Sequence, residues 1–391
     1  MLSLESIILC LLIINIFLVF YPFLVYPVVL YIISLFKKQR YIINNNSKEL
    51  PELTVVIAAY NEEKNITDAI LSLYKDGYDH NKLRVIVGID GKTDNTDLEI
   101  NKLQKIYPNI EYYILEHRGK NAVLNTIIPK VKTCYYLVMD ADMRVKENTL
   151  VKMVVPLMLN EKIGAVLANM EKINISENDT NNAGSTGEKI YQKFETFLRK
   201  KESNIRTTVN AFGFIAMRRD EFLPIPNDFM CDDFFAILKT NSMKKNVFFI
   251  DDLYVQEISR QSLSGEVNRR QRMIAGSLAT IKYYKKLLLP NYGFTSFALW
   301  SHKCLRYLLP LYLIIIAITS IFIPPSIFRD FLIYFQLCFY LMSIIAVILE
   351  KNGIRMLLFK ILSFFLMMNY SCILGIFRFC FGRQNSSWKR N

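Results

Sequence analysis

Three short motifs in the middle of this 391-residue chain carry side chains that could act on a phosphorylated compound. Asp140 and Asp142 flank one alanine directly after the apolar run YYLVM, and paired carboxylates of this kind can hold Mg²⁺ or Mn²⁺ together with substrate phosphates. Asp90 follows a second apolar run, where its carboxylate could accept a hydrogen bond from a nucleobase or a ribose hydroxyl. Lys120 opens a helical stretch, where its ammonium and the backbone N–H groups could face phosphate. Each motif can also be a turn, a helix cap or a basic helix start, so local evidence leaves both interpretations open.

The segments around these motifs alternate short β-branched runs with helical stretches from Leu53 to about Arg219. Near-continuous apolar strands separated by amphipathic helices indicate an α/β fold with a mostly parallel sheet covered on both faces. In open sheets of this kind ligands bind beyond the carboxyl ends of strands, which is where the acidic motifs lie. The predicted strands are LTVVIAAY, LRVIVGID, IEYYILE, CYYLVMD and GAVLANM; a helix is predicted over 188–205, a linker over 41–50 and a loop over 174–186.

The apolar content of the chain indicates a membrane protein with a soluble part. Apolar residues make up 52% of the sequence and charged residues 21%, whereas soluble domains are about a quarter charged. Residues 7–36 carry no charge, and their length exceeds one span but falls short of two, so we expect one anchor with an interfacial end near Pro22 and Pro27. A cleaved signal peptide is the alternative, but the stretch has no basic start and no small-residue cleavage site. Further apolar stretches follow at 307–328, 331–349 and 356–377.

The net charge of +13 does not indicate a nucleic-acid-binding protein, because no recognisable nucleic-acid module accompanies it. Basic residues beside membrane spans obey the positive-inside rule and meet anionic lipids. The seven cysteines include no Cys-x-x-Cys pair, which favours reduced thiols over a zinc site or a disulfide framework. With three histidines in the chain, a His-rich metal centre is also excluded.

The order of eight segments along the chain resembles the membrane-bound family 2 glycosyltransferases, the group that includes hyaluronan, cellulose and poly-N-acetylglucosamine synthases. The resemblance covers roughly residues 53–310 and implies a GT-A nucleotide-sugar domain between membrane segments. The eight segments are VVIAAYNEEKNI, GIDGKTDNT, RGKNAVLN, VMDAD, NAFGFIAMRRD, CDDFFAILK, EVNRRQRMIAG and WSHKCLRYLLP.

The resemblance also implies a role for individual residues. Asp233 stands where the family has its general base, although the neighbouring Asp232 leaves open which carboxylate takes the proton. Arg272 falls on the family's basic motif at the leaving diphosphate; the alternatives are a helix cap for the aspartates and a membrane-surface patch for the arginines. The nucleotide-sugar-binding residues would be Asn61, Glu62, Asp90, Lys120, Asp140 and Arg269, and the ligands of Mg²⁺ or Mn²⁺ would be Asp142 and Asp140.

These residues predict an inverting glycosyltransferase that takes a UDP-linked sugar to a saccharide or lipid-linked acceptor. A processive synthase that extrudes its polymer is the alternative, and a membrane transporter with a nucleotide-sugar-sensing domain is a remote one. We expect limited or non-processive transfer, because Met273 stands where processive members carry a tryptophan that stacks on the acceptor. Other aromatic side chains could substitute for that tryptophan: Phe212, Phe214 and Tyr283.

The catalytic domain is expected in the cytosol, at the plasma (inner) membrane, because Lys37, Lys38 and Arg40 mark the inner end of the first span. Three full spans after the domain would place the basic C-terminal tail outside. We therefore expect the last stretch, interrupted by Lys360 and Asn369, to lie partly in the interface. The expected organisation is an anchor (1–36), a basic linker (37–52), the GT-A domain (53–265), interfacial helices (266–304), membrane segments (305–378) and a basic tail (379–391).

Overall fold

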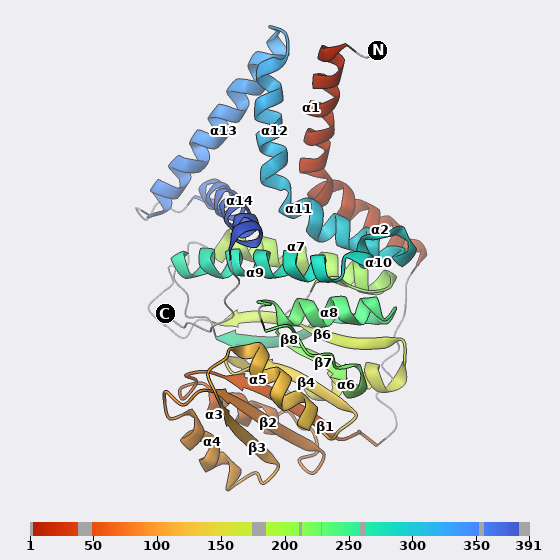
Figure 1. Cartoon of the computed structure of the whole chain (residues 1–391), viewed down its shortest axis with the longest axis vertical. Coiled ribbons are helices and arrows are strands. Elements are labelled where there is room, and N and C mark those ends of the chain that lie inside the picture. Colours follow the sequence, from red (N-terminus) through yellow and green to blue (C-terminus); the bar gives the residue numbers. More distant parts are fainter. Residues whose placement is uncertain are drawn as a thin grey trace.

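The computed structural model describes residues 3–37, 49–173, 185–210, 213–227, 229–258, 263–351 and 356–382. The predicted linker over 41–50, the predicted loop over 174–186 and the basic tail lie largely outside these residues, as do Lys38, Arg40 and Phe212. In the described part, a sheet domain lies at one end of the molecule and three upright helices at the other, with a layer of helices between them (Figure 1).

The sheet has eight strands in the order β3-β2-β1-β4-β7-β6-β8-β5. Strands β3, β2, β1 and β4 run parallel, β7 is antiparallel to both of its neighbours, and β8 is parallel to β6. The short β5 pairs antiparallel with β8. The strands are β1 Leu53–Ala59, β2 Leu83–Asp90, β3 Ile110–Leu115, β4 Tyr135–Asp140, β5 Met143–Arg144, β6 Ile163–Ile173, β7 Ile215–Arg218 and β8 Asn246–Ile258.

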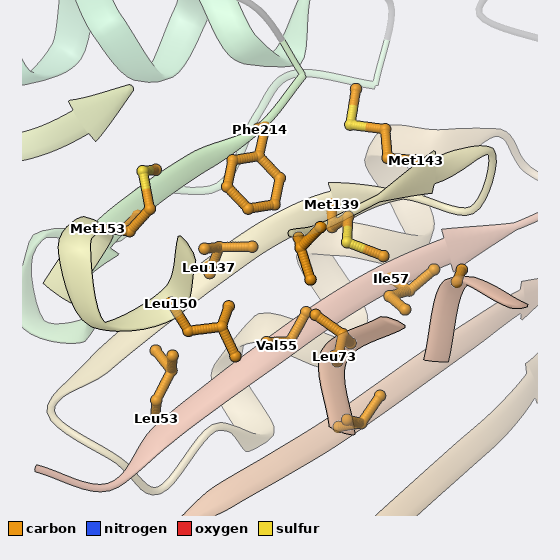
Figure 2. Close-up of a cluster of buried hydrophobic side chains, with 14 of the residues drawn as sticks. Leu53, Val55, Ile57, Leu73, Leu137, Met139, Met143, Leu150, Met153 and Phe214 are labelled. Atoms are coloured by element: carbon orange, nitrogen blue, oxygen red, sulfur yellow. The ribbon is translucent and has the colours of Figure 1, made fainter. Parts of the chain in front are cut away.

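Helices cover both faces of this sheet, which is why its central strands are apolar throughout. All seven residues of β1 are buried. Because successive side chains point to opposite faces, Val55 packs with one core and Val56 with the other. Figure 2 shows the first core, in which β1 and β4 meet α3 (Ile66–Tyr74) and α6 (Thr149–Leu159). The second core lies under α5 (Lys120–Ile127) and α8 (Asp232–Ser242).

The prediction of a mostly parallel α/β sheet is confirmed, and the five predicted strands correspond to β1, β2, β3, β4 and β6. Sequence analysis missed β5, β7 and β8, and with them the antiparallel part of the sheet. Strand β8 carries Asp251 and Asp252 in its middle, which look like a turn in the sequence. Its register against β6 shifts at this point, since Ile250 pairs with Ala168 and Tyr254 with Asn169. The strand therefore accommodates the acidic pair in an irregularity without ending.

The layer between the sheet and the upright helices consists mainly of α7 (Ser185–Ile205) and α9 (Leu263–Tyr283), with α2 (Tyr26–Phe36) and α10 (Phe294–Leu299) beside them (Figure 1). The first helix changes direction at the π-helical turn Tyr21–Val25, which contains Pro22. Beyond that turn, Tyr26 and Leu30 pack against Leu198 of α7. The remaining elements of the chain are α1 Leu4–Phe20, α4 Thr96–Gln104, α11 Leu305–Tyr307, α12 Leu309–Phe322, α13 Ile327–Lys351, α14 Leu357–Phe381, and short 3-10 or π-helical turns at Ile128–Lys130, Arg219–Glu221, Lys285–Leu288, Pro290–Tyr292 and Trp300–Cys304.

Three helices in the described part are long and apolar enough to cross a membrane: Leu4–Phe36, Ile327–Glu350 and Leu357–Phe381. A fourth span is added if Phe294–Tyr307 and Leu309–Phe322, which meet at a bend of 58°, count as one broken span. The last helix, α14, packs along α9 in the intermediate layer, where a Cβ on Gly375 would come within 2.7 Å of Ile274. Its course thus differs from that of the upright α12 and α13 (Figure 1).

Candidate active site

The acidic motifs meet at one edge of the sheet because they end neighbouring strands. Ala58 of β1 pairs with Gly88 of β2 on one side and with Asp140 of β4 on the other. Asp90, two residues after Gly88, therefore flanks β1 opposite Asp140 at the carboxyl ends of the strands. The structure thus brings these two carboxylates to the edge at which the strand order predicted them.

Asp90 organises the loop that leads into α5. Its buried carboxylate accepts hydrogen bonds from the backbone N–H groups of Arg118 (2.8 Å) and Gly119 (3.0 Å). His117 Nδ1 lies 3.0 Å from the same carboxylate. Gly119 has a φ of 91°, a backbone conformation that favours glycine. Asp90 therefore fixes the path of the segment that begins α5 and places Lys120.

The rings of Tyr60 and His117 stack at this edge, with centroids 4.7 Å apart. Sequence analysis gave neither ring a role. The available signal was their position, since Tyr60 follows β1 directly and His117 comes two residues after the end of β3.

Asn61 and Glu62 lie in different environments in the turn after β1, because Asn61 is exposed and Glu62 is buried. Asn61 has a positive φ of 55°, and its side-chain oxygen accepts a hydrogen bond from the Thr93 hydroxyl. Glu62 is buried, and its carboxylate accepts a hydrogen bond of 2.7 Å from the Asn65 amide. Its backbone N–H also donates to the Thr96 hydroxyl at 3.0 Å. Asn61 thus lies at the exposed surface of the edge, while Glu62 supports the turn from inside.

Lys120 joins the two acidic motifs that lie far apart in the sequence. Its ammonium is 2.6 Å from Asp140 Oδ1 and 3.0 Å from Asp232 Oδ2. Burial alone would lower the pKa of Lys120, but the two carboxylates outweigh it and raise this pKa above its ordinary value. The lysine is therefore a permanent cation between the end of β4 and the start of α8.

Asp233 makes different contacts from its neighbour Asp232, and its own pKa is raised. It accepts a hydrogen bond of 2.7 Å from the backbone N–H of Phe234. Burial, followed by the charge of Asp232, raises the pKa of Asp233 to about 6. Both carboxylates line a largely apolar pocket with Tyr136 and Phe235, which accounts for the desolvation. Asp233 is thus poised to exchange a proton near neutral pH, whereas Asp232 is the ion-pair partner of Lys120.

Asp140 and Asp142 form a pair of hard oxygen ligands at the end of β4. The described residues contain no group of three His, Cys, Asp or Glu side chains that could hold a metal ion alone. Gly213 approaches Asp140 so closely that a Cβ there would be 2.5 Å from Asp140 Oδ2. Room beside this oxygen and two carboxylates fit a divalent ion whose remaining ligands come from substrate phosphates or water.

Arg269 and Arg272 lie one turn apart on α9, which packs against the start of α8. The Cys231 thiol donates to the Met273 carbonyl at 3.3 Å, so α9 runs beside the residue that precedes Asp232. Burial, and then the neighbouring Arg378 and Arg269, lower the pKa of Arg272. Both arginines therefore lie on a separate helix, beside the start of α8.

Comparisons with known proteins agree with this geometry. Residues 54–223 match the model of glycosyl transferase family 2. The chain is 30% identical over 136 residues to the probable glycosyltransferase YdaM of Bacillus subtilis (strain 168), covering 34% of this chain and 32% of that protein. It is 32% identical over 160 residues to the poly-beta-1,6-N-acetyl-D-glucosamine synthase of Staphylococcus aureus (strain COL), covering 39% of this chain and 38% of that protein. The match therefore spans only about a third of the length of these curated relatives.

A solved structure shows the same fold over nearly the whole chain. The mannosyltransferase PcManGT from Pyrobaculum calidifontis, solved with GDP-Man and Mn²⁺, superposes with a TM-score of 0.72 over 97% of this chain and 99% of that one, at 19% identity. The family match ends before Asp232, so the positions of α8 and α9 rest on the structure itself. Residues 54–223 therefore match a glycosyl transferase family 2 domain, and nearly the whole chain shares the GT-A fold of the Pyrobaculum structure.

Proposed function

We propose that this enzyme is an inverting glycosyltransferase that moves a sugar from a UDP-linked donor to a saccharide or lipid-linked acceptor at the cytosolic face of a membrane. The observation that carries the proposal is the bridge from Asp140 through Lys120 to Asp232. It brings the strand end suited to a nucleotide diphosphate next to the helix that carries Asp233. The matching polysaccharide synthase of Staphylococcus aureus supports an acceptor of the saccharide class.

The donor would lie along the carboxyl edge of the sheet. Asn61 and the loop held by Asp90 would contact the nucleotide, with Glu62 supporting the turn from below. The first turn of α5 presents backbone N–H groups and Lys120 toward phosphate. Mg²⁺ or Mn²⁺ would be held by Asp142 and Asp140, and it would neutralise charge on the diphosphate. The Pyrobaculum mannosyltransferase with its GDP-Man and Mn²⁺ supports a divalent ion of this kind.

Asp233 would act as the general base. The acceptor hydroxyl oxygen forms a bond to the anomeric carbon while the bond from that carbon to the diphosphate oxygen breaks. The hydroxyl proton passes to the Asp233 carboxylate, and the nucleoside diphosphate leaves with the electron pair. Since attack comes from the face opposite the leaving group, the anomeric configuration inverts. Asp232, engaged with Lys120, would position the base and not replace it.

Arg272 and Arg269 would approach the leaving diphosphate from α9. Two guanidinium groups one turn apart stabilise negative charge as it develops on phosphate oxygens. Their position on a helix that packs against the start of α8 supports this role, because α9 lies between α8 and the upright apolar helices (Figure 1).

The experiment is a screen of the full chain in native membranes or detergent with UDP-sugars and GDP-sugars, with and without Mg²⁺ or Mn²⁺. We expect a UDP-sugar to release UDP in a metal-dependent way and to label a saccharide or lipid fraction. Release of GDP alone would overturn the donor assignment. Failure of every nucleotide sugar, with the protein shown to be folded, would overturn the proposed function.

We further propose a multi-pass protein of the plasma (inner) membrane with the sheet domain in the cytosol. The three candidate spans support membrane insertion, and the packing of α14 along α9 supports an interfacial position for this helix. A reporter fused after residue 391 should then be active in the cytosol. Activity only on the outer side would restore a third full span after the domain.

A further inference from the structure

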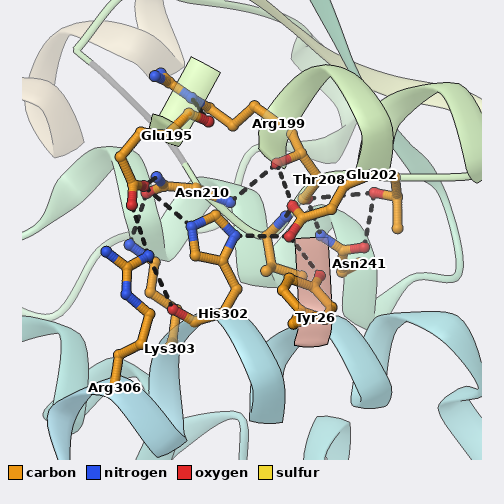
Figure 3. A network of polar contacts seen from close by, with 12 residues as sticks. Tyr26, Glu195, Arg199, Glu202, Thr208, Asn210, Asn241, His302, Lys303 and Arg306 are labelled. Carbon is orange, nitrogen blue, oxygen red and sulfur yellow. Dashed lines mark hydrogen bonds and ion pairs between the residues drawn. The ribbon is translucent and has the colours of Figure 1, made fainter. Parts of the chain in front are cut away.

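A buried network of charges ties the sheet domain to the bent helix that leads into the membrane (Figure 3). We call residues 294–307, which bend by 58° into α12, the elbow. His302 of the elbow lies between two carboxylates of α7, with Nε2 at 3.0 Å from Glu195 and Nδ1 at 2.6 Å from Glu202. All three side chains are buried.

The carboxylates of this network are ionised. Burial alone would raise the pKa of Glu195, but Arg306 and His302 outweigh it and hold this pKa well below its ordinary value. Each ring nitrogen of His302 thus faces a carboxylate oxygen of α7. Glu202 also accepts from the Tyr26 hydroxyl at 2.7 Å. The elbow, α7 and the first membrane helix therefore share one buried cluster.

The network includes Asn210, which precedes the active-site residue Gly213 in the sequence. The Asn210 amide nitrogen donates to Glu195 at 2.5 Å, and its amide oxygen accepts from the Lys303 ammonium at 2.6 Å. Both ends of the amide are thus held by groups from two different elements, which fixes its orientation. Asn210 lies three residues before Gly213, the residue in close approach to Asp140.

Lys303 also touches the helix that carries the base. Its half-buried ammonium lies 5.4 Å from the centre of the Phe234 ring, in a cation–π contact. Phe234 follows Asp233 in the chain, and its backbone N–H donates to the Asp233 carboxylate. One side chain of the elbow thus contacts both Asn210 and the first turn of α8.

We propose that Lys303 is a positioning residue for sugar transfer, which holds the Asp140 side and the Asp233 side of the active site in register from the membrane elbow. The inference rests on the proposed function. Stability alone does not account for such a cluster, because burying charges costs desolvation that apolar packing would avoid. A misplacement of about 1 Å between reacting groups can lower a rate by about 100-fold, so a fixed register has a direct effect on transfer.

The test is a double-mutant cycle in the full-length protein. Lys303→Met removes the cation and the hydrogen bond to Asn210 but keeps a flexible apolar chain over Phe234. Asn210→Ala removes the other partner, and Lys303→Arg restores a cation with donors. Lys286→Met, on an exposed lysine of the Lys285–Leu288 turn, is the matched control. The readouts are kcat, KM for the UDP-sugar, UDP binding and thermal unfolding.

We expect Lys303→Met to lower kcat by about 10- to 100-fold with KM for the donor unchanged within about threefold. Asn210→Ala should give a similar loss, the double variant should lose no more than the larger single loss, and Lys303→Arg should recover most of the rate. Lys286→Met should behave as the wild type. Additive losses, or a loss that follows the fall in thermal stability with no recovery in Lys303→Arg, would overturn the inference. If the wild type itself releases no UDP, the proposed function fails first, and the two failures are therefore distinguishable.

Discussion

Polar side chains gather in two regions of the molecule: the edge of the sheet at the carboxyl ends of β2 and β4, which we call the donor edge, and the buried network around His302. The two regions differ in how far apart their members lie in the sequence. At the donor edge, Asp90 and Asp140 follow the strands that position them, and most partners are backbone N–H groups of nearby loops. In the network, Glu195 bonds to His302 and Arg306, which lie 107 and 111 residues further along the chain. The first region is organised by strand ends and the second by packing between helices. Under the proposed function, binding of the donor would therefore depend on the strand ends of the sheet, and placement of the acceptor would depend on the helices that lead to the membrane.

The largest loss of transfer rate is expected from substitution of Asp233, which lies on α8 between the donor edge and the network around His302. Asp233→Asn should lower transfer by about 10²- to 10⁴-fold, because the amide cannot take up the proton, while UDP binding stays nearly intact. The matched variant is Asp232→Asn, which loses the ion pair with Lys120 and should weaken donor binding more than it affects the base. Full turnover by Asp233→Asn together with an inactive Asp232→Asn would assign the base to Asp232.

Removal of the proposed metal ligand Asp142 should weaken binding of the nucleotide sugar at the donor edge. Asp142→Ala is expected to weaken metal-dependent UDP-sugar binding by roughly 10- to 100-fold, the range seen when support for a bound metal is lost. Titration calorimetry with Mn²⁺ and with a chelator separates the metal-dependent part of binding. Glu147→Ala, on an exposed carboxylate five residues further on, is the control. Undiminished binding by Asp142→Ala in Mn²⁺ would remove Asp142 from the metal site.

Substitution of Asp90 tests whether donor binding depends on the conformation of the loop that leads into α5. Asp90→Ala leaves the buried N–H groups of Arg118 and Gly119 without their acceptor, which costs about 1–3 kcal/mol for each unsatisfied group. We expect a donor affinity at least about fivefold lower, since the loop that places Lys120 loses its anchor. Asp79→Ala, an exposed aspartate before β2, should bind like the wild type. Equal affinity in both variants would mean that the loop holds its shape without Asp90.

The pH dependence of transfer separates the base from the permanent cations around it. As the proposed general base, Asp233 would work only as a carboxylate, and burial raises the pKa of this carboxyl to about 6. Its charged fraction, and kcat/KM with it, should therefore stay nearly level above about pH 7 and fall about tenfold between pH 7 and pH 5. The acid limb should have a slope of one in a plot of log kcat/KM against pH. A profile that is flat down to about pH 4.5 would exclude a base with this pKa.

The same contrast explains what could be predicted from the sequence. The strands β1 to β4 were predicted because apolar runs of the right length end in acidic residues, and the edge that joins Asp90 with Asp140 follows from strand order. The bridge from Lys120 to Asp232 could not be predicted, because it joins residues more than a hundred positions apart. The segment 188–205 was predicted as a helix from its apolar positions, yet Glu195, Arg199 and Glu202 are buried within it. Charged residues on a helix normally indicate a solvated face, and only a partner such as His302 makes their burial possible.

The smallest effect is expected at Met273, and it concerns product length. Met273 is exposed on α9, where its backbone carbonyl accepts from Cys231 and its sulfur lies 3.5 Å from Arg269. A thioether can fill space beside an acceptor but offers no flat apolar face on which a terminal sugar could stack. The two aromatic side chains in the described part that could take the place of a tryptophan are poorly suited to it. Phe214 is buried in the sheet core, and Tyr283 packs edge-on against Phe229 at 5.7 Å.

We therefore predict that Met273→Trp lengthens the product while changing the rate of UDP release by less than about threefold, because the substitution retains the acceptor without touching the base. Product length is measured with excess acceptor under single-encounter conditions, with Met243→Trp, an exposed methionine at the end of α8, as the control. The wild type should add one or a few sugars to each acceptor. Long chains made by the wild type before most acceptor is consumed would contradict the prediction. They would show that other groups retain the product and that processive transfer does not need a stacking residue at position 273.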